Sequence, residues 1–312
     1  MDKIDQKLLK ELDVNPRIPL SRLAKKIRVS QQVADYRLKR LLKQKVITKL
    51  SSIINLKALG LEHYRIFFTF NAKKEVETQQ IFSYLREQNG LYWAARIGGR
   101  YDLLTVIFVQ DFEAFDQFID HFNNTFPGLI KDYKSCYGVR HTILGHKFFG
   151  TNTTTTSYGY NDRPVKIDAL DKQIISSITN NCRRPALDMA KQMNVSYKTI
   201  INRIKRLEKK QVILGYRMFI QSLDYKPFIV LFSYREYTKE KEKKLLAYMS
   251  QKSQITQTVQ LFGVWNLFAH ARCKDYESTQ ELIIELRDHF NIIDDFEIIP
   301  VFEDIMINLY PK

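Results

Sequence analysis

Apolar residues recur at the spacing of an α-helix in three short segments at the start of the chain. The residues that form the three apolar stripes are, in order, Ile4, Leu8, Leu9 and Leu12; Leu20, Leu23, Ala24 and Ile27; and Val33, Ala34, Leu38 and Leu41. Asn15-Pro16-Arg17 separates the first predicted helix from the second, and Arg28-Val29 turns the chain before the third. The pattern therefore predicts three short helices.

Three short helices with a tight turn before the third are typical of the helix-turn-helix. Ser30 directly precedes the third helix, where a serine hydroxyl accepts a hydrogen bond from a free backbone N–H of the first turn. Two apolar pairs, Val46-Ile47 and Ile53-Ile54, then predict short strands in the position of a wing. Residues 1–59 are therefore predicted to form a winged helix-turn-helix domain.

The same segment occurs twice in the chain. Residues 4–54 and 170–220 align without a gap at a shift of 166, and 16 of the 51 aligned positions are identical. The identical pairs include Asp5 and Asp171, Arg37 and Arg203, and Arg40 and Arg206. Residues 164–225 are therefore predicted to form a second helix-turn-helix domain, with Ser196 in the place of Ser30.

Each helix-turn-helix segment is followed by a stretch that alternates between strand and helix patterns. In the first copy, strands are predicted at 64–70, 91–97, 103–109 and 129–144, and helices at 75–88 and 111–123. In the second copy, the same order of elements occupies 227–234, 239–251, 255–262, 266–272, 275–289 and 293–309. The order is βαββαβ, which predicts the ferredoxin-like arrangement of a four-stranded sheet with two helices on one face.

The predicted strands are apolar on both faces. Residues 64–70 carry large apolar side chains at both alternating sets of positions, and 103–109 is almost wholly apolar. Because helices cover only one face of such a sheet, the other face needs a second layer. The sheet of the sibling copy is the expected partner, so we predict an intramolecular pseudo-dimer. The predicted fold class is α+β, with two copies of a winged helix-turn-helix and a ferredoxin-like domain.

The segment between the two copies is polar and rich in threonine. Residues 149–163 show no helical period and predict a flexible linker. Two ferredoxin-like domains, at 60–148 and 226–312, complete the predicted organisation.

The positive charge of the chain is concentrated in the two helix-turn-helix segments. The whole chain carries a net charge of +15 at pH 7. Residues 1–59 contain 15 basic and 5 acidic side chains, and residues 163–225 contain 13 and 5. The remainder of the chain has a small acidic excess, so the distribution of charge favours double-stranded DNA as a partner.

Composition argues against several other classes of protein. The three cysteines are widely spaced and form no CxxC pair, which argues against disulfides and structural zinc and fits a reducing cytosol. No apolar run approaches the ~18–20 residues of a membrane helix, and the N-terminus does not resemble a signal peptide. We expect no membrane association, no metal ion, no cofactor and no catalytic residue.

The two third helices carry the predicted DNA contacts. Amide side chains can bind adenine edges, and basic side chains can bind phosphates. The predicted residues are Ser30, Gln31, Gln32, Asp35, Tyr36, Arg37, Lys39 and Arg40 in the first copy, and Ser196, Tyr197, Lys198, Asn202, Arg203, Lys205 and Arg206 in the second. Arg37 and Arg203 lie at the edge of the apolar stripe, so phosphate contact and bracing of the helix both remain open. Because the two sets differ, we expect a target that is not a perfect palindrome.

The chain resembles the Lrp/AsnC family of prokaryotic transcription regulators, also called feast/famine regulators. The matching positions are Ile4-Asp5, Leu8-Leu9, Asn15, Arg17, Leu23-Ala24, Val29-Ser30, Arg37, Arg40-Leu41, Val46-Ile47 and the hairpin Gly99-Arg100-Tyr101-Asp102. The resemblance covers essentially the whole chain, twice, and implies a sequence-specific regulator that is cytoplasmic and nucleoid-associated. One chain holds here what is usually a dimer in the family, and a homodimer or higher homo-oligomer of this chain remains open.

The resemblance also implies a small-molecule effector, because many family members bind amino acids near the hairpin between the second and third strands. By resemblance, the effector-binding residues are Gly99, Tyr101 and Asp102, with Gly263, Trp265 and Asn266 in the second copy. The second copy departs from the family pattern, since an asparagine replaces the carboxylate that would suit a ligand ammonium. Both hairpins are equally explained as ordinary turns, so the presence of an effector remains open.

Two alternative functions also remain open. Some proteins of this architecture resemble regulators yet decarboxylate siroheme, which requires basic residues and an acid or base. Arg96, Arg140, His141 and His146 are the candidates for that chemistry, but no recognised catalytic motif is present. The other alternative is a nucleoid architectural protein without sequence preference, which the amide side chains of the third helices disfavour.

Overall fold

The computed structural model describes residues 2–71, 75–88, 90–147, 155–159, 162–221 and 224–311, and these form two compact units. Unit 1 consists of Met1–Leu59, Leu144–Thr156 and Pro164–Leu223, and unit 2 consists of Gly60–Ile143, Ser157–Arg163 and Asp224–Lys312. Unit 1 therefore contains both helix-turn-helix segments, and unit 2 contains both βαββαβ segments. The predicted α+β class and its two-copy architecture are confirmed, while the four predicted domain boundaries stay predictions.

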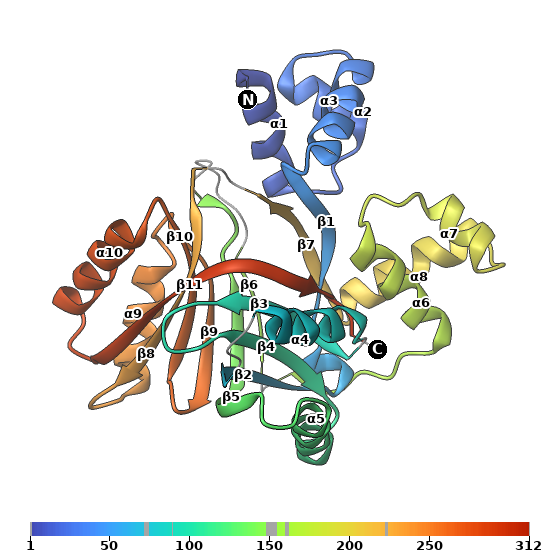
Figure 1. The fold of residues 1–312 in the computed structure, drawn as a ribbon. Coiled ribbons are helices and arrows are strands. Elements are labelled where there is room, and N and C mark those ends of the chain that lie inside the picture. Colours follow the sequence, from blue (N-terminus) through green and yellow to red (C-terminus); the bar gives the residue numbers. More distant parts are fainter. Residues whose placement is uncertain are drawn as a thin grey trace. The chain divides into compact units, whose positions relative to one another are not determined.

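Unit 1 contains the three-helix arrangement twice, each time followed by a strand (Figure 1). The first copy comprises α1 (Lys3–Val14), α2 (Leu20–Ile27), α3 (Gln31–Lys43), β1 (Ile47–Ile54) and a 3-10 turn at Lys57–Leu59. The second copy comprises α6 (Ala169–Asn180), α7 (Ala186–Gln192), α8 (Tyr197–Lys209) and β7 (Ile213–Ile220). Before each third helix, one residue has a left-handed backbone: Arg28 with φ 60° and Asn194 with φ 52°. The same turn therefore recurs in both copies.

The strands β1 and β7 pair with each other in antiparallel register, with Ile54 opposite Ile213 and Ile47 opposite Ile220. The prediction of two short strands in a wing was wrong, because 47–54 is one continuous strand whose partner belongs to the other copy. The side chains from Leu50 to Ile54 are all buried, so this strand has neighbours on both faces. A wing at the protein surface would leave one face exposed.

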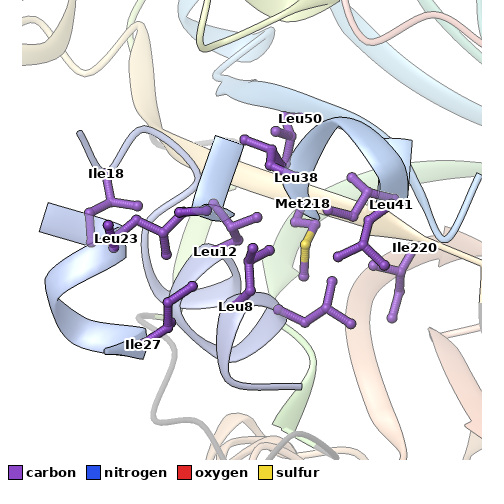
Figure 2. Close-up of a cluster of buried hydrophobic side chains, with 14 of the residues drawn as sticks. Leu8, Leu12, Ile18, Leu23, Ile27, Leu38, Leu41, Leu50, Met218 and Ile220 are labelled. Atoms are coloured by element: carbon purple, nitrogen blue, oxygen red, sulfur yellow. The ribbon is translucent and has the colours of Figure 1, made fainter. Parts of the chain in front are cut away.

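The hydrophobic core of the first helix-turn-helix includes side chains from the second copy. Figure 2 shows Met218 and Ile220 of β7 among the leucines of the first copy, such as Leu12 and Leu38. Burying one such side chain contributes roughly 1.5–3 kcal/mol. The two helix-turn-helix segments therefore share a core and stabilise each other.

One residue predicted in the apolar stripe of α3 lies outside it. Val33 is 39% exposed, whereas Ala34, Leu38 and Leu41 are buried. These three residues follow the i, i+4, i+7 spacing of one helical face, and Val33 lies about 100° from Ala34 around the helix. The sequence pattern therefore placed one apolar residue too many in the core.

Unit 2 contains the predicted βαββαβ order twice (Figure 1). The first copy comprises β2 (Glu62–Phe70), α4 (Glu75–Glu87), β3 (Leu91–Ile97), β4 (Leu103–Val109), α5 (Phe112–Thr125) and β5 (Ile130–Ile143). The second copy comprises β8 (Lys226–Tyr234), α9 (Lys239–Met249), β9 (Ile255–Gly263), β10 (Leu267–Cys273), α10 (Tyr276–His289) and β11 (Ile293–Ile307). In the first copy, Ile66 and Phe68 of β2 pack against the helices through Phe82 and Phe122.

The strands of unit 2 form one continuous sheet that closes on itself. Among the described residues, the order of hydrogen-bonded neighbours is β2-β4-β3-β11-β8-β10-β9-β5, and β5 pairs again with β2. The long last strand of each copy makes this closure: β5 pairs with β9, and β11 pairs with β3. The expected pairing of the two sheets is thus realised as an eight-stranded barrel, with the helices on its outside and the faces opposite them inside.

The predicted linker at 149–163 falls partly outside the described residues. Within it, residues 156–159 form β6 (Thr156–Gly159), which lies next to β5 in the sheet. This part differs from the prediction of a flexible linker because Tyr158 is buried and its hydroxyl hydrogen-bonds to His141 at 2.6 Å. No described helix is long and apolar enough to cross a membrane.

Candidate nucleic-acid interface

The third helix of each copy begins at the serine that the sequence predicted as its N-cap. Ser30 Oγ accepts a hydrogen bond from the backbone N–H of Val33 at 3.2 Å. Ser196 Oγ accepts one from the backbone N–H of Thr199 at 3.0 Å. Each serine satisfies one of the free N–H groups of the first helical turn, so both predicted caps are confirmed.

Ion pairs tie α3 to the first helix of its own copy. Arg37 Nη1 lies 2.6 Å from Asp2 Oδ2 and 2.9 Å from Asp5 Oδ1. Arg40 Nη2 donates to the other carboxylate oxygen of Asp5 at 2.5 Å. Because the side chain of Asp5 is only 3% exposed, these two arginines supply the positive charge that its burial requires.

The second copy repeats this arrangement residue for residue. Arg203 contacts Asp168 and lies 3.1 Å from Asp171 Oδ1. Arg206 donates to the other oxygen of Asp171, whose side chain is fully buried. The arginines thus brace α8 against α6, as their equivalents brace α3 against α1. The sequence left two roles open for Arg37 and Arg203, phosphate contact and bracing of the helix, and the structure shows the bracing role.

These ion pairs between the first and third helices, called braces below, shift the pKa values of several of their members. The hydrogen bond from Arg37 lowers the pKa of Asp2 from 3.8 to about 2 and raises the pKa of Arg37. In the second copy, the hydrogen bond from Arg203 lowers the pKa of Asp168, and the pKa of Arg203 rises in turn. All of these groups are therefore charged at neutral pH, and the braces persist throughout the physiological range.

The remaining predicted contacts lie on the exposed face of each third helix. The exposed residues are Gln31, Gln32, Tyr36 and Lys39 on α3, and Tyr197, Lys198, Asn202 and Lys205 on α8. Asp35 is half-buried and forms an ion pair with Lys39 at 2.7 Å. The fifteen predicted residues thus divide into two caps, four braces, one acidic partner and eight exposed side chains.

Comparison with known proteins identifies the family. The AsnC-type helix-turn-helix domain matches the chain twice, at residues 1–42 and 167–208. An uncharacterized HTH-type transcriptional regulator of Pyrococcus abyssi is 30% identical over 105 residues, which are 33% of this chain and 70% of that relative. The chain belongs to the Lrp/AsnC family of transcriptional regulators.

Further similarities extend this assignment. The regulatory protein AsnC of Escherichia coli is 26% identical over 124 residues, which are 38% of this chain and 78% of that protein. Among solved structures, the siroheme decarboxylase NirDL has a TM-score of 0.67 at 14% identity, over 99% of this chain and 94% of that chain. At such identity the likeness to NirDL shows a shared fold alone.

The two hairpins of this Lrp/AsnC chain are held by equivalent hydrogen bonds. Asp102 Oδ2 accepts from the backbone N–H of Phe70 at 2.7 Å. Asn266 Oδ1 accepts from the backbone N–H of Tyr234 at 2.8 Å. An amide oxygen and a carboxylate oxygen serve equally as acceptors, which explains why the second copy can carry asparagine. Both side chains therefore have a structural role in the hairpin.

The other residues predicted at the hairpins also have structural roles. Gly99 and Gly263 have φ values of 78° and 140°, which favour glycine. Tyr101 is 3% exposed and Trp265 is 8% exposed. The ring of Tyr101 packs 5.3 Å from that of Phe67. Their role in effector binding stays a prediction.

The two histidines considered for catalysis lie in different units. His141 belongs to unit 2, where its Nδ1 is 2.6 Å from the hydroxyl of Tyr158. His146 belongs to unit 1, where its Nδ1 is 2.8 Å from Asp13 Oδ1 and both side chains are nearly buried. Each histidine thus has its own partner within its own unit.

Sequence reasoning missed the carboxylates of the braces. Asp2 and Asp168 are the N-caps of the first helices, and Asp5 and Asp171 follow three positions later. The one available signal was the identity of Asp5 and Asp171 between copies, because a charged residue kept in an apolar stripe requires a buried partner.

Proposed function

We propose that the chain is a sequence-specific DNA-binding regulator of transcription whose third helices, α3 and α8, bind two unlike half-sites in the major groove. The observation that carries this proposal is that different side chains of each helix hold it in place and face the solvent. Buried aspartates hold its arginines, while its N-terminal half presents other polar side chains to solvent. A helix held rigidly with an exposed polar N-terminal half is the form in which helix-turn-helix proteins contact base edges.

The exposed side chains divide into readers of bases and binders of phosphate. Gln31, Gln32 and Asn202 carry amides, which form paired hydrogen bonds with the N6 and N7 edge of adenine. Lys39 and Lys205 carry flexible ammonium groups suited to phosphate oxygens. We assign base recognition to the amides and salt-dependent affinity to the lysines.

The two helices differ most where base contacts are expected. The first exposed pair is Gln31-Gln32 in α3 but Tyr197-Lys198 in α8. Two unlike recognition surfaces on one chain favour an asymmetric target, in contrast to the palindromes that identical subunits bind.

Selection of bound sites from random duplex DNA tests the proposal, with the full chain at about 150 mM salt. We expect an enriched motif with two unlike half-sites about one or two helical turns apart. The matched variants are Gln31→Ala with Gln32→Ala in one protein, and Asn202→Ala in another. Each variant should lose base preference in one half of the motif and keep the base preference of the other half. Two identical inverted half-sites would overturn the assignment of unlike readers.

Other outcomes of the same selection favour the alternative functions. Binding without enrichment would favour a nucleoid architectural protein. Absence of binding would favour an enzyme, and incubation of the full chain with siroheme followed by mass spectrometry tests that case. We propose a non-enzymatic role, so the mass of siroheme should not change. A loss corresponding to carbon dioxide would contradict it.

We further propose that the protein acts in the cytoplasm, on the nucleoid, and that one chain is the binding unit. Each chain already holds two helix-turn-helix segments joined by β1 and β7, so a second chain is not needed to supply the second half-site. Light scattering of the protein without DNA should give a mass of 37.0 kDa, and a multiple of this mass would contradict a single-chain unit. An amino-acid effector at the hairpins remains part of the proposal, and calorimetry with the amino acids tests it.

A further inference from the structure

The barrel of unit 2 contains a buried positive charge that no carboxylate of the described residues compensates. Arg65 on β2 is 1% exposed, and its guanidinium lies 4.2 Å above the ring of Phe268 on β10. Among the described residues, its Nε has no hydrogen-bond partner, and the Arg65 side chain forms no ion pair. Burial of an unpaired charge is strongly unfavourable, so the fold alone does not account for this residue.

The groups around Arg65 are neutral at physiological pH. Those close enough to influence its pKa are Tyr158, Tyr92 and Cys136, and none of them is an acid with a low pKa. Burial lowers the pKa of Arg65 to about 10, so the guanidinium nevertheless carries its charge at pH 7. The interior therefore holds one net positive charge at this position.

The second copy shows that the fold does not require an arginine at this position. The strand β8 is equivalent to β2 at a shift of 164, and Ile229 occupies the place of Arg65. Ile229 is fully buried. Pro227 likewise occupies the place of His63. The same barrel thus accepts ordinary apolar residues where the first copy has a cation and an imidazole.

Polar and aromatic groups converge beside Arg65. His63 lies two residues away on the same face of β2 and stacks on Phe108 at 4.5 Å. The ring of His141 lies 5.9 Å from that of His63 and its Nδ1 is 2.6 Å from Tyr158 Oη. A Cβ at Gly138 would lie 2.0 Å from His63 Nδ1, so the absence of a side chain there makes room for the imidazole.

We propose that the interior of this barrel binds a small monocarboxylate, whose two oxygens accept hydrogen bonds from the guanidinium of Arg65. A single buried positive charge is neutralised by a single negative charge, which favours a monoanion over a phosphate dianion. The planar guanidinium matches the two oxygens of a carboxylate, and the aromatic surroundings favour a planar apolar body on the ligand. The interior of an eight-stranded barrel is just wide enough to be filled by side chains or to hold one small ligand.

This inference does not depend on DNA binding, because every residue it uses belongs to unit 2. It also differs from the hairpin prediction, since Asp102 and Asn266 take no part in it. Loss of the carboxylate site and failure of the DNA-binding proposal would therefore be separate results.

The test uses the full chain and two probes, sodium benzoate and sodium acetate, with sodium chloride and sodium phosphate at equal ionic strength as comparisons. Calorimetric titration and thermal unfolding report binding. The variants are Arg65→Ile, which installs the residue of the second copy, and Arg65→Gln, which removes the charge but keeps much of the size. Arg86→Gln is the matched control, because Arg86 is also in unit 2 but is exposed and paired with Glu303 at 3.0 Å.

We expect benzoate to raise the unfolding temperature of the wild type and of Arg86→Gln by about 3 °C near saturation. Both Arg65 variants should bind benzoate at least about tenfold more weakly, since a charge-assisted pair is lost. Without ligand, Arg65→Ile should unfold at the same temperature as the wild type or higher.

Four results would overturn the proposal. Unchanged benzoate binding in both Arg65 variants would place the probe elsewhere, such as the cavity of about 390 Å³ lined by Leu61 and Phe118. If neither benzoate nor acetate binds, the ligand is not a carboxylate. If phosphate binds and its binding depends on Arg65, the ligand is a phosphate instead. Unfolding of both Arg65 variants would show that the arginine has a structural role.

Discussion

Removing the negative charge of Asp171 should loosen α8 while leaving α3 in place. Asp171 is fully buried and accepts hydrogen bonds from Arg203 at 3.1 Å and from Arg206. The substitution Asp171→Asn keeps the size of the side chain but turns one acceptor oxygen into an NH2 group that faces an arginine. We therefore expect the loss of one charge-assisted hydrogen bond and of the ion pairing to both arginines.

The magnitude follows from the burial of the partners. A hydrogen bond to a charged group contributes ~1.5–3 kcal/mol. The side chains of Arg203 and Arg206 are 26% and 42% exposed, so water screens part of this interaction. We therefore expect a loss of about 2 kcal/mol, which corresponds to an opening equilibrium about 30-fold more favourable. Asp5→Asn is the matched variant in the first copy.

Hydrogen–deuterium exchange of the full chain measures both helices in one experiment. In Asp171→Asn, the amides of α8 should exchange about 30-fold faster, and those of α3 should keep their protection. Asp5→Asn should give the reverse pattern. Unchanged exchange of α8 in Asp171→Asn would refute the bracing role. Equal loss of protection in both helices would refute its confinement to one copy.

Three further predictions address other parts of unit 1. Lys39→Ala should weaken binding to all DNA sequences alike. Titration at several salt concentrations should show that the slope of log affinity against log salt falls by about 0.9 in magnitude. A change in sequence preference would contradict the assignment of Lys39 to phosphate. Met218→Ala should destabilise the first helix-turn-helix by ~2–5 kcal/mol, because this side chain is 1% exposed in the core of that copy, and chemical denaturation measures the loss. The Asp2 carboxyl should titrate by NMR at about 2, and Arg37→Gln should return its pKa towards 3.8. Because the pKa of Asp2 is lowered in the folded state, its stabilising effect is present above pH 3.8 and disappears as the pH falls through about 2.

Features set by neighbouring residues could be predicted from the sequence. The caps Ser30 and Ser196 depend only on a hydroxyl three residues before a backbone N–H, and both form as expected. The glycine of the first hairpin is similar, since a positive φ at Gly99 is a local requirement of its turn. The duplication was visible for the same reason, because it is a comparison of sequence with sequence.

Features that depend on distant partners could not be predicted. The barrel closes because β5 and β11 extend beyond their own sheets to pair with β9 and β3, and no local pattern names the partner of a strand. Arg65 is the clearest case. Its position between apolar neighbours in 64–70 was visible, and a second sheet against this strand was expected, but no local pattern names Phe268 of the other copy as the ring that its guanidinium contacts.

Comparison of the two copies separates what the fold requires from what it tolerates. Where a contact is needed to build the domain, both copies keep it, as with the aspartate that holds two arginines or the side-chain oxygen that holds each hairpin. Where the copies differ at equivalent positions, each residue is compatible with the same backbone, so the difference is free to serve function. Gln31 against Tyr197 and Arg65 against Ile229 are differences of this kind. One lies at the proposed DNA contact and the other at the proposed carboxylate site, where the residue of the second copy supplies the test substitution Arg65→Ile.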